Sequence, residues 1–232
     1  MKQLFDIANV KIDEKQLAMF EIFYDYLVAE NEKYNLTAIT EKTDVYVKHF
    51  IDSVLIQNLS FDFSNKKMID IGTGAGFPLI PLKIMNPNLY INGLDSLNKR
   101  VSFIKSVCDQ LDLTGVGLIH GRAEDFGQDK KYREQYDFAV SRAVAELRLL
   151  LEFVMPFVKV DGYFLAYKSI KTKTELEEAS NALIQMKSKL IDTVEFMLPN
   201  DCGKREIMVI QKYGHIDKKY PRKAGVPKKS PL

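Results

Sequence analysis

The sequence predicts an α/β fold: a Rossmann-like, doubly wound sheet that ends in an antiparallel hairpin and carries a helical cap at its N-terminus. Residues 1–60 have apolar side chains at helical spacing, and residues 61–212 alternate strand-like and helix-like stretches. A glycine-rich turn follows the first strand, and residues 213–232 form a basic tail. We therefore expect a cap, a core and a tail within those limits.

The cap is expected to contain two helices joined by a connector at residues 35–40. One face of the first helix carries Leu17, Phe20, Tyr24 and Leu27. Asp44 is the expected N-cap of the second helix. His49 and Asp52 lie three positions apart on that helix, and this spacing favours a surface pair or a polar group between packed helices.

From residue 67 the alternation of strands and helices is typical of parallel βαβ units. Strands are expected at residues 68–71, 89–94, 116–120, 136–140 and 162–167, with two closing strands at 191–198 and 206–212. Helices are expected at residues 77–85, 101–111, 147–154 and 174–189. In such a sheet, ligands bind at the carboxyl ends of the strands.

The turn after the first strand has the pattern Asp70-x-Gly72-x-Gly74-x-Gly76. A dinucleotide site needs G-x-G-x-x-G, but Phe77 occupies the last position of that pattern, which disfavours an NAD-dependent oxidoreductase. The turn resembles motif I of class I S-adenosylmethionine (SAM) methyltransferases, where the three glycines would pass beneath the cofactor. An ordinary tight strand-to-helix turn is the alternative for the glycines alone.

Polar residues follow three further strands. Asp95 ends the second strand, where its carboxylate can accept both ribose hydroxyls or act as the N-cap of the next helix. Ala123 and Glu124 follow the third strand, where they can bind the adenine edge, although Glu124 is alternatively a solvated side chain. Together with the glycine turn, these residues predict one nucleoside site.

Arg142 ends the fourth strand, an unusual place for a guanidinium group. It can pair with the carboxylate of the cofactor or with a phosphate of the substrate. The structural alternative is an ion pair with Glu146 or Glu152. Phe77 can pack against the cofactor or belong to the core.

Charge is distributed unevenly along this chain of 232 residues. The net charge is +2, but residues 212–232 contain seven Lys or Arg and one acid, which leaves −4 for the rest. A basic segment of this kind points to a polyanionic partner.

Composition also limits the class of protein. Two cysteines, Cys108 and Cys202, cannot form a disulfide framework or a zinc site, and no other metal site is predicted. The sequence has no apolar run of membrane-spanning length and no signal-peptide pattern. We expect a cytoplasmic protein with no membrane partner.

Several segments occur in an order that resembles one family. They are 35–39 (NLTAI), 49–53 (HFIDS), the turn ending in Gly-Phe-Pro, 95–96 (DS) with 99–100 (KR), 122–124 (RAE), 141–145 (SRAVA) and 220–225 (YPRKAG). Together they closely resemble the bacterial 16S rRNA guanine-N7 methyltransferase family, RsmG or glucose-inhibited division protein B. The resemblance covers essentially the whole chain.

The resemblance implies SAM as cofactor and 16S rRNA or a small ribosomal subunit particle as partner, bound by a monomer. It implies SAM contacts from Gly72, Phe77, Ala123, Glu124 and Arg142. A non-catalytic SAM-binding RNA chaperone or ribosome assembly factor is the alternative. A methyltransferase acting on a small molecule or a protein is a further one, disfavoured by the basic tail.

The chemistry agrees with an N7 acceptor. Guanine N7 carries a lone pair and no proton, so direct displacement needs alignment and no general base. The sequence lacks the Asn/Asp-Pro-Pro-Tyr/Phe segment of exocyclic-amine methyltransferases and a nucleophilic cysteine loop. Arg142 and Lys168 are the positioning candidates, and no catalytic residue is assigned.

Seven cations are candidates for RNA contact: Lys99, Arg100, Lys168, Arg205, Lys219, Arg222 and Lys223. For any single lysine, a solvated surface charge is the alternative. We expect that removing residues 213–232 weakens RNA binding and its salt dependence but spares SAM binding.

Overall fold

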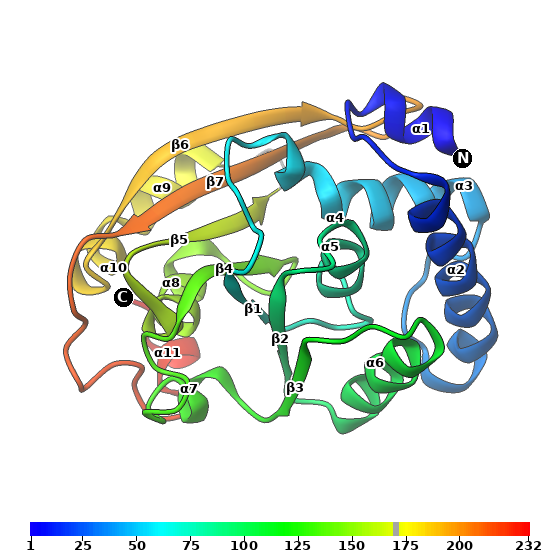
Figure 1. The fold of residues 1–232 in the computed structure, drawn as a ribbon. Helices are drawn as coiled ribbons and strands as arrows, with labels where there is room; N and C mark the ends of the chain where they lie inside the picture. The colour runs from blue at the N-terminus through cyan, green and yellow to red at the C-terminus, as the bar shows by residue number, and fades with distance from the viewer. Residues whose placement is uncertain (169–171) are drawn as a thin grey trace.

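The computed structural model describes residues 1–168 and 172–232. Within them, seven strands form one sheet in the order β3-β2-β1-β4-β5-β7-β6 (Figure 1). The first five strands pair in parallel, and β7 pairs antiparallel with both β5 and β6. The predicted doubly wound sheet with a terminal hairpin is confirmed.

Each predicted strand is present; the limits of β3 are as predicted, and those of the others are shifted. The strands are β1 Lys67–Ile71, β2 Tyr90–Asp95, β3 Val116–His120, β4 Tyr136–Arg142, β5 Val158–Lys168, β6 Ser188–Met197 and β7 Lys204–Lys212. β1 is buried from its second residue onward because helices cover both faces of the sheet at its centre. β5 begins four residues earlier than predicted because Val158 pairs with Tyr136 across an irregularity in the ladder.

The core helices are α5 Leu79–Met85, α6 Asn98–Gln110, α7 Ala123–Phe126, α8 Leu147–Val154, the 3₁₀ turn η3 Met155–Phe157, α9 Thr172–Glu178 and α10 Ser180–Gln185; α11 Val226–Lys229 lies in the tail. The single polar helix predicted at 174–189 is wrong. It is divided at the buried Ala179 into α9 and α10. Its last residues belong to β6, because Ser188 and Lys189 pair with β7 instead of extending the helix.

The cap consists of α1 Lys2–Ile7, α2 Glu14–Tyr34, α3 Lys42–Val45, the π-helix η1 Tyr46–Ile51, α4 Asp52–Val54 and the 3₁₀ turn η2 Leu55–Asn58. α2 begins with a capping box between Asp13 and Gln16 and ends at Asn35, whose φ is 49°. The predicted N-cap at Asp44 is wrong. Glu41 is the N-cap of α3, and its carboxylate accepts the backbone N–H of Asp44.

The cap shares its core with one face of the sheet. Phe23 of α2 packs against Phe77 with ring centroids 5.3 Å apart, and Phe20 packs against Phe50 at 4.9 Å. The same apolar cluster continues to Val209 on β7. The cap is therefore packed onto the core, next to the glycine turn.

The basic tail is packed onto the opposite layer, where α11 lies beside α7 and α8 (Figure 1). Ile216 and Tyr220 are buried, and the Arg133 guanidinium donates to the carbonyl oxygens of both. No helix within the described residues has the length and apolar character that a bilayer crossing needs.

Candidate functional site

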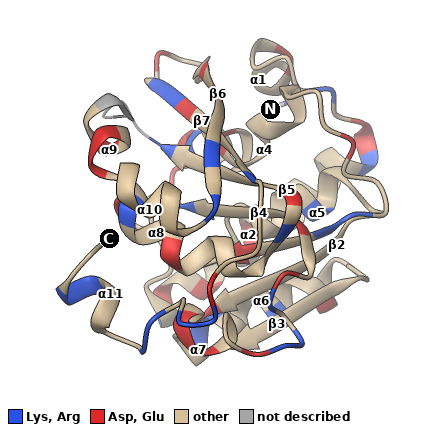
Figure 2. Ribbon diagram, turned by 90° about the vertical axis from the view of Figure 1, so that its left-hand side faces the viewer, with Lys and Arg blue, Asp and Glu red and all other residues tan. Residues whose placement is uncertain are grey.

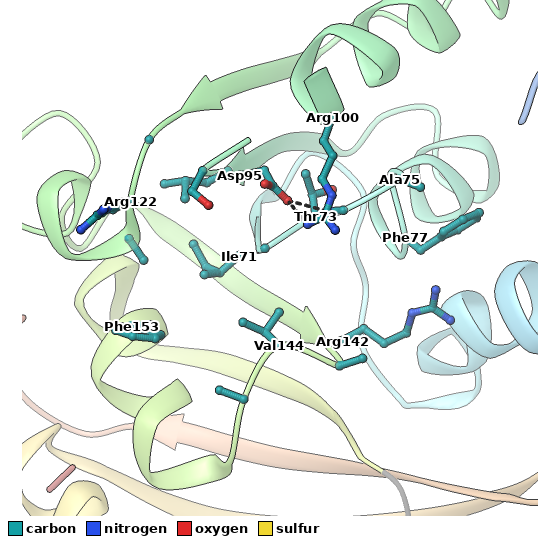
Figure 3. Close-up of a pocket in the computed structure, with 18 of the residues that line it drawn as sticks. Ile71, Thr73, Ala75, Phe77, Asp95, Arg100, Arg122, Arg142, Val144 and Phe153 are labelled. Atoms are coloured by element: carbon teal, nitrogen blue, oxygen red, sulfur yellow. Dashed lines mark hydrogen bonds and ion pairs between the residues drawn. The ribbon is translucent and has the colours of Figure 1, made fainter. Parts of the chain in front are cut away.

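A cavity of about 600 Å³ opens at the carboxyl ends of the parallel strands. It is lined by seven of the eight predicted cofactor residues: Gly72, Gly74, Phe77, Asp95, Ala123, Glu124 and Arg142. Figure 3 shows Phe77 and Arg142 at one end of the cavity and Arg122 and Phe153 at the other. The structure therefore brings together the side chains that were predicted from their positions at strand ends.

The glycine turn lies close to Val144, which also lines the cavity. Gly72 has a φ of +76°, and a Cβ placed there would lie 2.6 Å from Cγ2 of Val144. Gly76, the eighth predicted residue, does not line the cavity. A Cβ at Gly76 would lie 2.8 Å from Ile80, so this glycine permits the packing of the following helix.

Asp95 is held by the turn that it faces. Its Oδ2 accepts the backbone N–H of Gly74 at 2.9 Å and lies 3.4 Å from Nη1 of Arg100, while Oδ1 accepts the N–H of Leu97 at 2.9 Å (Figure 3). Leu97 is the N-cap of α6, so Asp95 is not. The carboxylate retains acceptor capacity for hydroxyl groups, as a ribose site requires.

Asp70 lies beneath the turn with no exposed surface. Neither of its carboxylate oxygens has a hydrogen-bond partner among the described residues, and the same holds for the buried hydroxyl of Thr73. Burial raises the pKa of Asp70 to about 7. Thr73 lines the cavity, whereas Asp70 lies behind this lining, where the nearby Thr73 hydroxyl and the Leu79 backbone partly offset the effect of burial on its pKa.

Arg142 points toward the cap. Its Nη1 donates to Oδ2 of Asp52 at 2.7 Å and to the carbonyl oxygen of Lys48 at 3.0 Å, and its Cζ lies 5.2 Å from the centroid of the Phe77 ring. The alternative pairing with Glu146 or Glu152 is wrong. Those carboxylates pair with arginines outside the cavity.

Cap residues that the sequence did not assign to the site also line the cavity: Leu36, Thr37 and His49. His49 stacks on Phe77 with centroids 4.6 Å apart, and its Nε2 lies 2.8 Å from Oγ1 of Thr37. Burial and the charge of Arg142 lower the pKa of His49 to about 4, so the ring is neutral near pH 7. The surface-pair interpretation of His49 and Asp52 is wrong, since Asp52 is only 5% exposed.

A family model described as rRNA small subunit methyltransferase G (GidB) matches residues 16–207. The chain belongs to this family. It is 48% identical over 227 residues to ribosomal RNA small subunit methyltransferase G of Leuconostoc mesenteroides, covering 97% of this chain and 95% of the relative. It is 47% identical over 232 residues to the Streptococcus gordonii enzyme of the same name, covering 99% and 97%.

Solved structures agree on the fold alone. A SAM-dependent methyltransferase from Aquifex aeolicus aligns with a TM-score of 0.54 and 15% identity, covering 79% of this chain and 97% of that one. Precorrin-6y C5,15-methyltransferase from Geobacter metallireducens gives 0.51 and 16%, covering 77% and 92%. The class I methyltransferase fold is thus confirmed, and this rRNA methyltransferase uses SAM as its methyl donor.

The tail of this methyltransferase contributes to the lining of the cavity. Lys228 lines it, and Oε1 of Glu124 accepts the backbone N–H of Gly225 at 3.3 Å. The tail is anchored by Arg222, whose Nη2 lies 2.6 Å from Oε2 of the buried Glu152. The sequence showed the charge of this segment but contained no signal for its contact with the cofactor side.

The seven predicted RNA-contacting cations are distributed over α6, the end of β5, the terminal hairpin and the tail. Lys223 is exposed, and Lys99 donates to the Tyr34 carbonyl oxygen. Each of the other five forms an ion pair with a carboxylate: Arg100 with Asp95, Lys168 with Glu175, Arg205 with Asp52, Lys219 with Asp217 and Arg222 with Glu152. Figure 2 shows Lys and Arg along β6, β7 and α11. Among the described residues, no group of three His, Cys, Asp or Glu could hold a metal ion.

Proposed function

We propose that this enzyme methylates N7 of one specific guanosine in bacterial 16S rRNA, with SAM as the donor. The observation that carries the proposal is the shared cavity, in which Asp95 and the glycine turn face Arg142 and the cap residues Thr37 and His49. The strand ends would bind the nucleoside of SAM, and the cap forms a separate wall of the same cavity. A second ligand bound at the cap side would therefore lie in contact with SAM. Family membership supports rRNA as the second ligand.

The residues divide between binding and alignment. SAM supplies an electrophilic methyl group. We assign the ribose hydroxyls to Asp95, the adenine edge to Ala123 and Glu124, and the carboxylate of the methionine moiety to Arg142. Gly72 would leave the backbone free to approach the cofactor.

No residue needs to remove a proton, because N7 offers a lone pair. The chain must hold N7 roughly 3–3.5 Å from the methyl carbon, in line with the breaking bond. A cation directed at N7 would oppose the gain of positive charge on the base. The neutral His49 and the orientation of Arg142 toward Asp52 are consistent with this requirement.

Lys168 is proposed as a positioning residue. Its Nζ lies 2.6 Å from Oε2 of Glu175 and donates to the carbonyl oxygen of Ala145 at 3.1 Å. Ala145 lines the cavity, so these contacts fix the segment that follows Arg142.

The proposal is tested by incubating the protein with tritiated SAM and either naked 16S rRNA or small subunits from cells that lack the enzyme. We expect label in RNA and, by mass spectrometry, one 7-methylguanosine. Binding of both ligands without label would favour the assembly-factor alternative. Label on another atom would contradict the N7 assignment.

Arg142→Ala tests the assigned cofactor contact. We expect weaker SAM binding, measured by isothermal titration calorimetry, because a charge-assisted hydrogen bond is lost. Normal affinity of this variant for both SAM and RNA would contradict the assignment. A ribosomal substrate also keeps the cytoplasm as the expected location, and sedimentation at working concentration tests the predicted monomer.

A further inference from the structure

Asp52 is a buried carboxylate that contacts guanidinium groups from two different strands. Its Oδ2 lies 2.7 Å from Nη1 of Arg142 on β4, and its Oδ1 lies 3.2 Å from Nε of Arg205 on β7. Asp52 itself begins α4 of the cap. One carboxylate therefore connects the cap, the parallel strands and the terminal hairpin.

The two contacts differ in quality. Arg142 makes a short hydrogen bond to Oδ2 and a second one to the Lys48 carbonyl oxygen, so its direction is fixed. Oδ1 has no hydrogen-bond partner among the described residues, although Nε of Arg205 is near, because the two groups are misaligned. The Arg205 guanidinium has one hydrogen bond of its own, from Nη1 to the carbonyl oxygen of Lys204 at 2.9 Å, and its contact with Asp52 is one of charge alone. Its side chain is 27% exposed.

The cluster carries a surplus positive charge, because two guanidinium groups share one carboxylate. The neighbouring lysines are matched one to one: Lys48 with Asp44 at 2.8 Å and Lys204 with Glu195 at 3.3 Å. Three other titratable groups lie nearby: His49, which is neutral, Asp70, whose pKa burial raises to about 7, and Tyr167, whose pKa burial raises well above its ordinary value. Glu206 follows Arg205 on β7 and points to the opposite face of the strand.

We propose that Asp52 is a positioning residue that directs Arg142 to the cofactor cavity and keeps Arg205 beside it as a binding site for one phosphate group of the RNA backbone. A guanidinium group binds a phosphate through two parallel N–H donors. Arg205 can offer such donors because, among the described residues, the only hydrogen bond of its guanidinium group is the one from Nη1 to the Lys204 carbonyl oxygen. The inference rests on the proposed function, since it takes RNA as the substrate. It adds to that function a specific contact next to the reacting groups.

The first test compares Arg205→Gln with Lys204→Gln, its neighbour on β7. Both variants lose one positive charge, but only Arg205 belongs to the cluster. We expect Arg205→Gln to raise the Kd for 16S rRNA about tenfold and to reduce the salt slope by about one phosphate contact, with the Kd for SAM unchanged. Lys204→Gln should change RNA binding far less. Equal RNA affinities and salt slopes for the two variants would overturn the phosphate site.

The second test uses Asp52→Asn, with Asp52→Glu as the charge-conserving variant. We expect Asp52→Asn to lower kcat by about 10- to 100-fold because Arg142 loses its direction. Its RNA affinity should be retained or increased, with a steeper salt slope, because one more cation is uncompensated. Asp52→Glu should restore the wild-type slope.

A purely structural tether predicts a different result for Asp52→Asn. The melting temperature and the affinities for SAM and RNA would then all decrease, while kcat at saturation and the salt slope would stay as in the wild type. That pattern would overturn the positioning role. Failure of the wild-type protein to label small-subunit RNA would instead contradict the proposed function on which the inference rests.

Discussion

At the scale of single residues, Asp70 shows how burial raises the free energy of an ionised carboxylate. It has no exposed surface, and its pKa of about 7 lies well above the ordinary value of 3.8 because burial disfavours the carboxylate. The folded state therefore retains a proton that the unfolded chain has lost. Asp70 contributes its full stability below about pH 4, and that contribution is lost as the pH rises through about 7.

Asp70→Asn tests this pH dependence. Asparagine resembles the protonated acid in size, so the free energy of unfolding of the variant should exceed that of the wild type increasingly from pH 4 to 7, by about 1.4 kcal/mol per pH unit at most. Denaturant unfolding at pH 5 and pH 8 measures the difference. A constant difference across this range would mean that Asp70 ionises normally in the folded state.

Gly72 is constrained by both its backbone and its neighbour. An alanine at its φ of +76° costs roughly 1–2 kcal/mol, and the added Cβ displaces Val144 from the cavity wall. Gly72→Ala should therefore weaken SAM binding about tenfold, measured by calorimetry. Gly203→Ala is the matched control, because its φ is +92° and its nearest neighbour, Nη1 of Arg205, is 3.8 Å away. It should lose stability without loss of SAM affinity, and equal SAM affinities for the two variants would contradict the steric role.

At the scale of elements, the tail takes part in the cofactor site as well as carrying charge. Its residues Gly225 and Lys228 reach Glu124 and the cavity. We therefore revise the sequence-based expectation that removing residues 213–232 spares SAM binding. Loss of Lys228 from the lining and of the Gly225 contact with Glu124 should reduce the affinity for SAM together with that for RNA, which calorimetry and filter binding measure.

Arg222→Gln tests the anchor of the tail. The variant leaves the buried Glu152 carboxylate without a counter-charge, with the backbone N–H of residue 222 as its remaining donor. This loss should destabilise the protein by about 3 kcal/mol and weaken SAM binding. Arg148→Gln is the control, because its pair with Glu146 is exposed and contributes about 1 kcal/mol or less. Thermal unfolding and calorimetry measure both effects. If both variants lost the same stability, the tail anchor would be no stronger than a surface ion pair.

The elements differ in how well the sequence predicted them. Strand tips could be predicted, because the order of βαβ units fixes which ends meet, and Asp95 and Glu124 lie at such ends. The contribution of His49 could not, since it depends on the packing of the cap onto Phe77, a contact distant in sequence. The partner of Arg142 was missed for the same reason. Asp52 lies 90 positions earlier in the chain.

At the scale of the whole molecule, the limits at residues 60 and 212 separate segments of different composition. The packing does not follow those limits, because the apolar cluster on one face of the sheet extends from Phe5 of the cap to Val209 on β7. The tail is joined to the other face through Ile216 and Tyr220. The site lies where these layers meet, so its residues depend on the packing of all three segments.

This arrangement predicts one cooperative unfolding transition. Far-UV circular dichroism, which reports the helices of the cap and core, and tyrosine fluorescence should give the same midpoint in denaturant, and SAM should raise it for both signals. A chain that begins at residue 61 should not fold by itself, because the face that packs Phe77 against Phe23 and Phe50 would be exposed to water. Two separated transitions, or a stable proteolytic fragment that starts near residue 61 and still binds SAM, would show instead that the cap is an independent domain and that Arg142 holds the cofactor without Asp52.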